Sequence, residues 1–161
     1  MWKRCRTFRH RDDGQSMVEF GMVVPALLIV LTGIFSFGII LNQYEILTNA
    51  VNSGARAFAL SRGQTTPTIA STDPCAYAIE ILEADAPNLT PGSLTFAITY
   101  TSNKASPGTV TTYTTSCTSL ATTMNTGDTV LIKATYPVTP MVFSWATKSL
   151  TLSASAEELV N

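Results

Sequence analysis

An uncharged stretch near the N-terminus constrains this chain more than any other feature. Residues 20–41 are 22 positions without a charge, and only the weakly polar Thr32 and Ser36 interrupt the apolar run. At about 1.5 Å per residue, a helix of this length reaches about 33 Å, which is enough to cross the hydrocarbon core of a membrane. The sequence therefore predicts a transmembrane span over residues 20–41.

The charges around this stretch are polarised. Five of the ten basic residues lie in the first eleven positions, namely Lys3, Arg4, Arg6, Arg9 and Arg11. A basic flank before the span and none directly after it predicts a cytoplasmic N-terminus, with everything from Asn42 onward outside. A cleaved secretory signal peptide is the alternative, but its apolar region is only about 7 to 15 residues long. The longer run favours a span that stays in the membrane.

The helical pattern continues beyond the span. Residues 42–61 contain no proline, and apolar or small residues recur near one face at helical spacing: Leu47, Ala50, Val51, Gly54 and Phe58. Gly63 and the Thr/Pro-rich stretch after it are typical of a helix end. We therefore expect one helix over residues 15–62, about 70 Å long.

The remaining part, residues 63–161, begins with a second helical signal. Asp73 followed by Pro74 is typical of a helix N-cap and first turn, so a short helix is expected over residues 74–85, ended by Pro87. The residues expected to face inward are Ala76, Ile79 and Leu82 or Ala86.

After this helix the apolar pattern changes to a period of two. The alternating apolar positions are Leu94, Phe96, Ile98 and Tyr100, then Val130, Ile132, Ala134 and Tyr136, then Leu150, Leu152, Ala154 and Ala156. Residues 109–115 form a weaker, Thr-rich candidate. The pattern predicts an α+β fold in which an antiparallel sheet of three to four strands packs on the outer half of the long helix. Its exposed face is expected to be mostly threonine and serine.

The three cysteines divide by compartment. Cys5 lies in the basic leader, whereas Cys75 and Cys117 lie in the exported part. An oxidising exterior allows Cys75 and Cys117 to form a disulfide, which would stabilise a small domain by about 3 to 4 kcal/mol. Two reduced thiols in the core are the alternative.

The segment Gly14-Gln15-Ser16-Met17-Val18-Glu19-Phe20 stands between the basic leader and the span. A glycine, an acid five positions later and an unbroken apolar helix resemble the prepilin class of proteins. Val18-Glu19-Phe20, Val24-Pro25 and the segment 48–56 are similar to the TadE-like minor pseudopilins of the tight-adherence (Flp-type) pilus system. Residues 14–62 carry this resemblance, and the exported domain carries it only loosely.

The resemblance implies a set of site residues and partners. A prepilin peptidase would cut between Gly14 and Gln15 and remove the leader 1–14, and Glu19 and Phe20 would serve assembly or recognition. Major pilins of this system carry tyrosine where this chain has Phe20. The implied partners are other pilins and pseudopilins, the inner-membrane assembly platform and membrane lipid. The implied location is the bacterial inner membrane. The resemblance leaves open whether the protein lies along the fibre, lies at its tip or only primes assembly.

Glu19 and Pro25 carry physical expectations of their own. A carboxylate carried to the bilayer centre costs about 2.5 to 3.5 kcal/mol, so Glu19 needs either a partner, such as a new ammonium at Gln15, or a place at the headgroup level. Pro25 removes a backbone hydrogen bond inside the span and predicts a helix kink.

Several function classes are disfavoured. The single histidine, His10, lies in the leader, so the exported domain has no imidazole, and we expect no catalytic residues, no metal and no cofactor. Residues 15–161 contain five basic and nine acidic side chains, which argues against a nucleic-acid partner. We expect no small-molecule substrate. The sequence therefore predicts a structural pilus-assembly protein, and the alternative is a membrane-tethered extracytoplasmic binding domain without prepilin processing.

Overall fold

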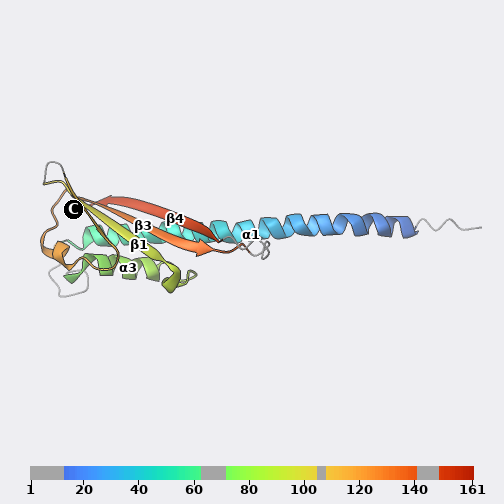
Figure 1. Cartoon of the computed structure of the whole chain (residues 1–161), viewed down its shortest axis with the longest axis horizontal. Helices are drawn as coiled ribbons and strands as arrows, with labels where there is room; N and C mark the ends of the chain where they lie inside the picture. Colours follow the sequence, from blue (N-terminus) through green and yellow to red (C-terminus); the bar gives the residue numbers. More distant parts are fainter. Residues whose placement is uncertain (1–12, 63–71, 105–107, 141–148) are drawn as a thin grey trace, which may run out of the picture.

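The computed structural model describes residues 13–62, 72–104, 108–140 and 149–161. The expectations for Cys5, His10 and Gly63 lie outside these residues. The described part consists of one very long helix, a second short helix and a four-stranded sheet (Figure 1).

The first helix, α1, runs without interruption over Asp13–Leu60, close to the predicted 15–62. Its N-terminal half projects from the rest of the molecule, and its C-terminal half packs against the sheet and the second helix (Figure 1). The predicted inner face of this half is confirmed, because Leu47, Val51 and Phe58 have no exposed surface. One helix therefore serves both the projecting and the packed parts of the molecule.

The strands form one antiparallel sheet in the order β2-β1-β3-β4. Their bounds are Thr95–Ser102 for β1, Thr109–Tyr113 for β2, Thr129–Val138 for β3 and Leu150–Leu159 for β4. The prediction of three to four antiparallel strands is confirmed, and the weak Thr-rich candidate forms β2. The two edges are the short β2 and the ten-residue β4.

The register places apolar side chains in rows across the inner face of the sheet. Ile98 pairs with Ile132, and Ile132 pairs with Ala156, and all three are buried. Phe58 of α1 meets this face at Tyr100, with 6.4 Å between the ring centroids. Alternate residues on the other face are largely threonine and serine, as the period of two requires.

One predicted inward residue of the sheet is wrong. Leu150 is 52% exposed, although Val138, its partner in the register, is buried. Leu150 is the first residue of an edge strand, so it has a neighbouring strand on one side only. The alternation predicts the face of the sheet on which this side chain lies, but not whether other residues pack over it.

The second helix, α3, spans Pro74–Ala84. Its buried face consists of Pro74, Cys75, Ala78 and Leu82. Leu82 and Ala86 are buried as predicted, and Ile79 is partly buried and packs against the core. The expectation that Ala76 belongs to the inner face is wrong, since Ala76 is only half-buried and Cys75 and Ala78 are buried on either side of it. In a segment with apolar residues on several sides, spacing alone does not set the phase of the buried stripe.

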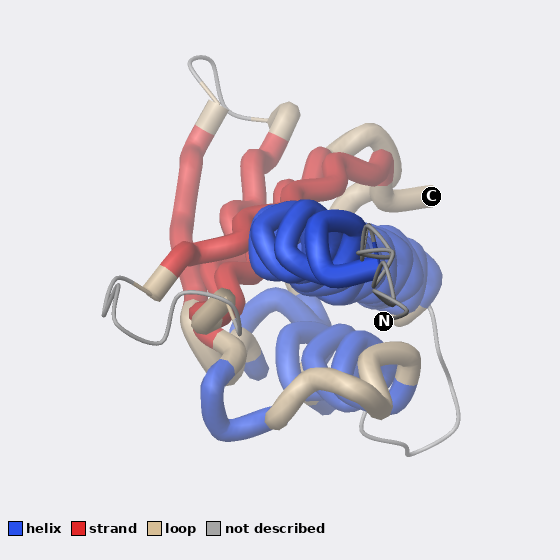
Figure 2. Tube along the Cα trace, turned by 90° about the vertical axis from the view of Figure 1, so that its right-hand side faces the viewer, coloured by secondary structure: helices blue, strands red, loops and turns tan. Residues whose placement is uncertain are grey.

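The elements stack in layers. Seen along its length, α1 lies between the sheet and α3 (Figure 2). Gly54 allows the close approach of the two helices, because a Cβ at this position would lie 3.0 Å from the carbonyl oxygen of Ala78 and 3.2 Å from Cβ of Leu82. Two 3₁₀ turns, η1 (Pro91–Ser93) and η2 (Thr118–Thr122), complete the described elements. The fold is α+β, as predicted.

Candidate functional site

The segment Gly14–Phe20 forms the first turns of the projecting half of α1, and all of its residues are exposed. Within it, Nε2 of Gln15 donates a hydrogen bond of 3.3 Å to Oε1 of Glu19. Residues four apart on a helix lie on one face, which brings these two side chains together. The structure thus gathers Gly14, Gln15, Glu19 and Phe20 at one end of the molecule.

The projecting half of α1 carries large apolar side chains that no other described part of the chain covers. Met17 is 77% exposed, Phe20 is 70% exposed and Phe35 is 68% exposed. Exposed apolar surface on this scale marks contact with a membrane or with other proteins. By length and composition, α1 is able to cross a membrane.

The polar group of Thr32 is satisfied inside this apolar half. Its hydroxyl donates to the carbonyl oxygen of Leu28 at 2.7 Å and is also 3.0 Å from that of Ile29. Such bonds to the preceding turn keep a hydroxyl paired where no water is available. Thr32 is therefore compatible with a place in the hydrocarbon core.

Pro25 lies inside α1 and does not end it. Proline has no N–H to donate, so the carbonyl oxygen of Gly21, one turn earlier, lacks its usual helical partner. The kink expected at this position stays a prediction.

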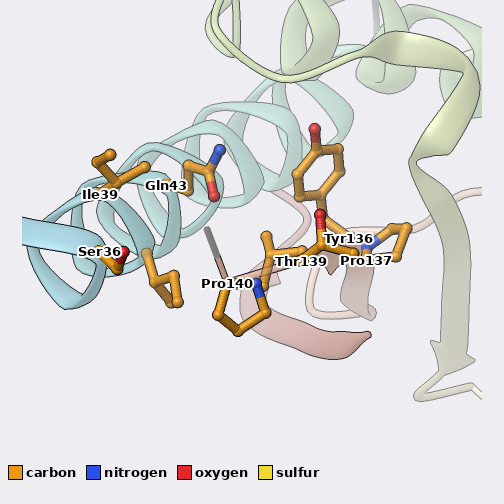
Figure 3. Close-up of a pocket in the computed structure, with 9 residues that line it drawn as sticks. Ser36, Ile39, Gln43, Tyr136, Pro137, Thr139 and Pro140 are labelled. Atoms are coloured by element: carbon orange, nitrogen blue, oxygen red, sulfur yellow. The ribbon is translucent and has the colours of Figure 1, made fainter. Parts of the chain in front are cut away.

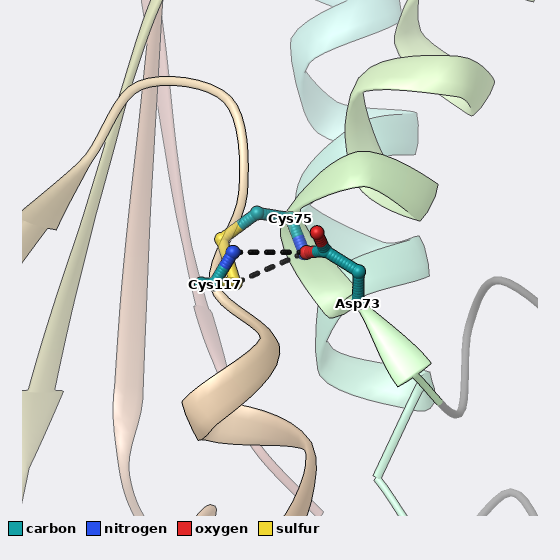
Figure 4. A group of neighbouring side chains, drawn as sticks. All are labelled: Asp73, Cys75 and Cys117. Atoms are coloured by element: carbon teal, nitrogen blue, oxygen red, sulfur yellow. Dashed lines mark hydrogen bonds between the residues drawn. A yellow bond between two sulfur atoms is a disulfide. The ribbon is translucent and has the colours of Figure 1, made fainter.

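A second cluster lies at the N-terminus of α3, within the sheet domain (Figure 4). Asp73 is the N-cap of α3, as predicted, and its Oδ1 accepts hydrogen bonds from the backbone N–H groups of Cys75 and Ala76, both at 3.2 Å. The same oxygen accepts from the N–H of Cys117 at 2.9 Å, and Oδ2 accepts from the hydroxyl of Ser116. One carboxylate thus joins α3 to the segment before η2.

Cys75 and Cys117 form a disulfide with a Cα–Cα distance of 5.4 Å, which confirms the predicted pairing. Together with Asp73 they bring ligand atoms within 4.8 Å of one another, a grouping that would suit a metal if the thiols were free. Because the two sulfur atoms are bonded to each other, they offer no thiolate ligand. The cluster therefore consists of a disulfide and the N-cap of α3.

The charge of Asp73 is stabilised by this arrangement. Partial burial raises the pKa of its carboxyl, but the hydrogen bonds from the Ser116 hydroxyl and from three backbone N–H groups outweigh burial. The pKa of Asp73 therefore lies below its ordinary value, as expected for a carboxylate that accepts several hydrogen bonds.

Sequence reasoning missed a third polar group. Asp128 has no exposed surface and accepts a hydrogen bond from the hydroxyl of Tyr100, and it lies in a turn whose Gly127 has φ +90°. An aspartate in a glycine-containing turn directly before a strand was the available signal. The turn signal at 126–128 revealed the position of the turn but not the burial of the carboxylate.

These features define a class of protein: a small α+β domain carried on a helix whose other half is apolar, exposed and long enough to cross a membrane. Residues 14–56 match the family model for TadE-like protein, so this part of the chain is similar to the TadE-like family. The match covers most of α1 and stops before the sheet. No curated protein and no solved structure matches the chain.

Proposed function

We propose that this protein is a minor pseudopilin of a tight-adherence, type IV-like pilus system, processed by a prepilin peptidase and acting structurally in pilus biogenesis and adhesion. The observation that carries the proposal is the family match that begins at Gly14, next to an exposed helix start. A peptidase needs an accessible peptide bond, and the side chains around Gly14 are open to approach.

Cleavage after Gly14 changes the charge at this end of α1. Hydrolysis of the bond between Gly14 and Gln15 releases an α-amino group at Gln15, whose ordinary pKa of about 8 leaves it mostly protonated at neutral pH. The carboxylate of Glu19 lies one helical turn away, within reach of the Gln15 side chain. The new ammonium, on this chain or on a neighbouring one, would neutralise Glu19 as the helix packs into an assembly.

The proposed placement follows from the charge asymmetry. The basic leader stays in the cytoplasm, residues 20–41 cross the bacterial inner membrane once, and the sheet domain lies on the extracytoplasmic side. The proposed partners are the prepilin peptidase, other pilins and pseudopilins, the inner-membrane assembly platform and membrane lipid. Exposed apolar side chains on the projecting half of α1 support contacts with lipid and with neighbouring helices.

The mass of the N-terminal peptide tests the processing step. Full-length wild type, Gly14→Ala and Gly21→Ala are recovered from membranes of cells that carry the peptidase. We expect wild type and Gly21→Ala to begin at Gln15 and Gly14→Ala to begin at Met1. Gly21→Ala is a matched control because neither glycine has an atom within 4 Å of an added Cβ. A wild-type chain that begins at Met1 would overturn the proposal and leave a tethered binding domain.

The role of Glu19 is tested separately. Glu19→Gln removes the charge but keeps the size of the side chain, and we expect cleaved protein that no longer supports piliation. Glu45→Gln is the control, since Glu45 is an exposed carboxylate in the packed half of α1. Normal piliation with Glu19→Gln would refute the assembly role.

A further inference from the structure

A groove lies where α1 meets the end of β3 (Figure 3). Its walls are Ser36, Ile39, Ile40 and Gln43 on α1 and residues 136–140, and its volume is about 290 Å³. All of these lining residues are uncharged. The groove therefore offers nothing that would select a charged ligand.

The position of the groove along α1 is set by helix geometry. A hydrocarbon core about 30 Å thick that begins at Phe20 ends about 20 residues later, near Ile40. Ile40 is a wall of the groove, whereas Ser36 lies one turn nearer the membrane centre and Gln43 one turn beyond Ile40. The groove thus straddles the level at which acyl chains give way to ester and glycerol groups.

The lining of the groove includes both apolar and hydrogen-bonding side chains. Ile39, Ile40 and Val138 supply apolar surface, and Gln43 and Thr139 supply an amide and a hydroxyl. Figure 3 shows Gln43 on α1 and Thr139 at the end of β3 on the two walls. An amphipathic molecule with an apolar chain and hydrogen-bonding esters fits this sequence of groups.

The groove is open to the lipid-facing surface of α1. Phe35 and Phe37, on either side of Ser36, are 68% and 62% exposed, and Ile39 in the wall is 38% exposed. A lipid that lies against the projecting half of α1 therefore reaches the groove without crossing water.

We propose that this groove binds a membrane phospholipid of the leaflet on the domain's side, with an acyl chain against Ile39 and Ile40 and the ester-glycerol region beside Gln43 and Thr139. The inference rests on the membrane anchoring in the proposed function. Its consequence is that the end of β3 lies in the interfacial layer of the bilayer, so that lipid contacts fix the sheet domain against the membrane surface.

Depth-dependent fluorescence quenching tests the position. Full-length Cys5→Ser protein carrying Thr139→Cys, Leu28→Cys or Thr126→Cys is labelled with bimane in vesicles of phosphatidylethanolamine and phosphatidylglycerol. Spin labels are placed on the lipid headgroup, near the ester or deep in the chain. We expect position 139 to be quenched most by the ester-level label and position 28 by the deep label. Position 126, an exposed residue in the turn before β3, should be quenched by none.

The outcomes separate the two proposals. If position 28 is not quenched, the membrane anchoring fails and the proposed function fails with it. If position 28 is quenched and position 139 is not, anchoring stands and the lipid groove is overturned.

Photo-crosslinking tests occupancy. A phospholipid with a diazirine near the top of its acyl chain is expected to label both peptides that contain the groove walls, around residues 36–43 and 136–140. Ile39→Trp fills the groove at a partly exposed position, and we expect loss of label from the 136–140 peptide, with unchanged label around Leu28 and an unchanged melting temperature. Undiminished labelling of 136–140, or crosslinks there to a second protein chain in place of lipid, would overturn the proposal.

Discussion

The hydroxyl of Tyr100 on β1 donates a hydrogen bond to Oδ2 of Asp128, a carboxylate without exposed surface in the turn before β3. The backbone N–H groups of Asn103 and Asn125 donate to the same carboxylate, each at 2.8 Å. Burial raises the pKa of Asp128, but these bonds outweigh burial and lower it below its ordinary value. Burial, together with the bond to Asp128, raises the pKa of Tyr100. The charged carboxylate therefore stabilises the folded domain.

Tyr100→Phe is expected to destabilise the domain by about 2 kcal/mol at pH 7, because a hydrogen bond to a buried charge is lost. A carboxyl with a depressed pKa stabilises the fold above about pH 4 and loses this contribution as the pH falls through its folded-state pKa. The difference between wild type and variant should therefore shrink at pH 3. Denaturant unfolding of the full chain in detergent, followed by circular dichroism at both pH values, measures it.

Tyr113→Phe is the control for this variant, because Tyr113 lies on β2 and is only partly buried. Tyr113→Phe should leave the free energy of unfolding nearly unchanged at pH 7 and at pH 3. A Tyr100→Phe effect that is equal at pH 7 and pH 3 would show that ring packing, not the charged hydrogen bond, carries the contribution.

Asp73→Ala is expected to lower the free energy of unfolding by about 2 kcal/mol, the upper end of the range for a lost N-cap, because the N–H of Cys117 also loses its acceptor. Asp85→Ala, at the exposed opposite end of α3, should change it much less. Thermal and denaturant unfolding of the two variants compare the helix ends directly. Equal effects would contradict the role of Asp73 as a junction between α3 and the η2 segment.

Reduction of the disulfide is expected to destabilise the domain by about 4 kcal/mol on the chain-entropy model, given that Cys75 and Cys117 are 42 residues apart. The midpoint of denaturant unfolding should fall when a phosphine reductant is present. The double variant Cys75→Ala, Cys117→Ala should have a low midpoint that reductant does not change. Cys5→Ser should respond to the reductant as wild type does. A wild-type midpoint that stays unchanged after complete reduction would contradict the prediction.

Gly54→Val is expected to force α1 and α3 apart, since even a Cβ would lie 3.0 Å from the backbone oxygen of Ala78. Overpacking of this kind costs about 1 to 3 kcal/mol. Gly38→Val places the same residue in the same helix where no atom lies within 4 Å of an added Cβ, so it controls for the propensity of valine. Comparable melting temperatures for the two variants would argue against tight contact at Gly54.

The sequence predicts the sheet well because its alternation has only two phases. Ile98, Ile132 and Ala154 are buried as expected, since a strand with one apolar face can only turn that face inward. Asp73 was found as an N-cap because capping depends on neighbours in the chain. Local signals of these two kinds are readable without tertiary structure.

The errors and omissions depend on contacts between distant segments. Positions 76 and 78 are both alanine, so their residue types do not distinguish them, and only the position of α1 decides that Ala78 is buried and Ala76 is not. The acceptor role of Asp128 toward Tyr100 depends on how β1 and β3 pair. The groove at Ile40 likewise exists only because the end of β3 reaches α1, a relation that no short-range pattern encodes.

The unbroken course of α1 has a mechanical consequence. Strands β3 and β4 run alongside its packed half, while the other half projects from the domain along the same axis (Figure 1). A pull on the projecting end is therefore directed along the packed half of α1 and loads its contacts with the sheet and with α3 in shear, so that many contacts bear the force together instead of opening one by one. A domain attached in this way resists extension along the axis of its own anchor.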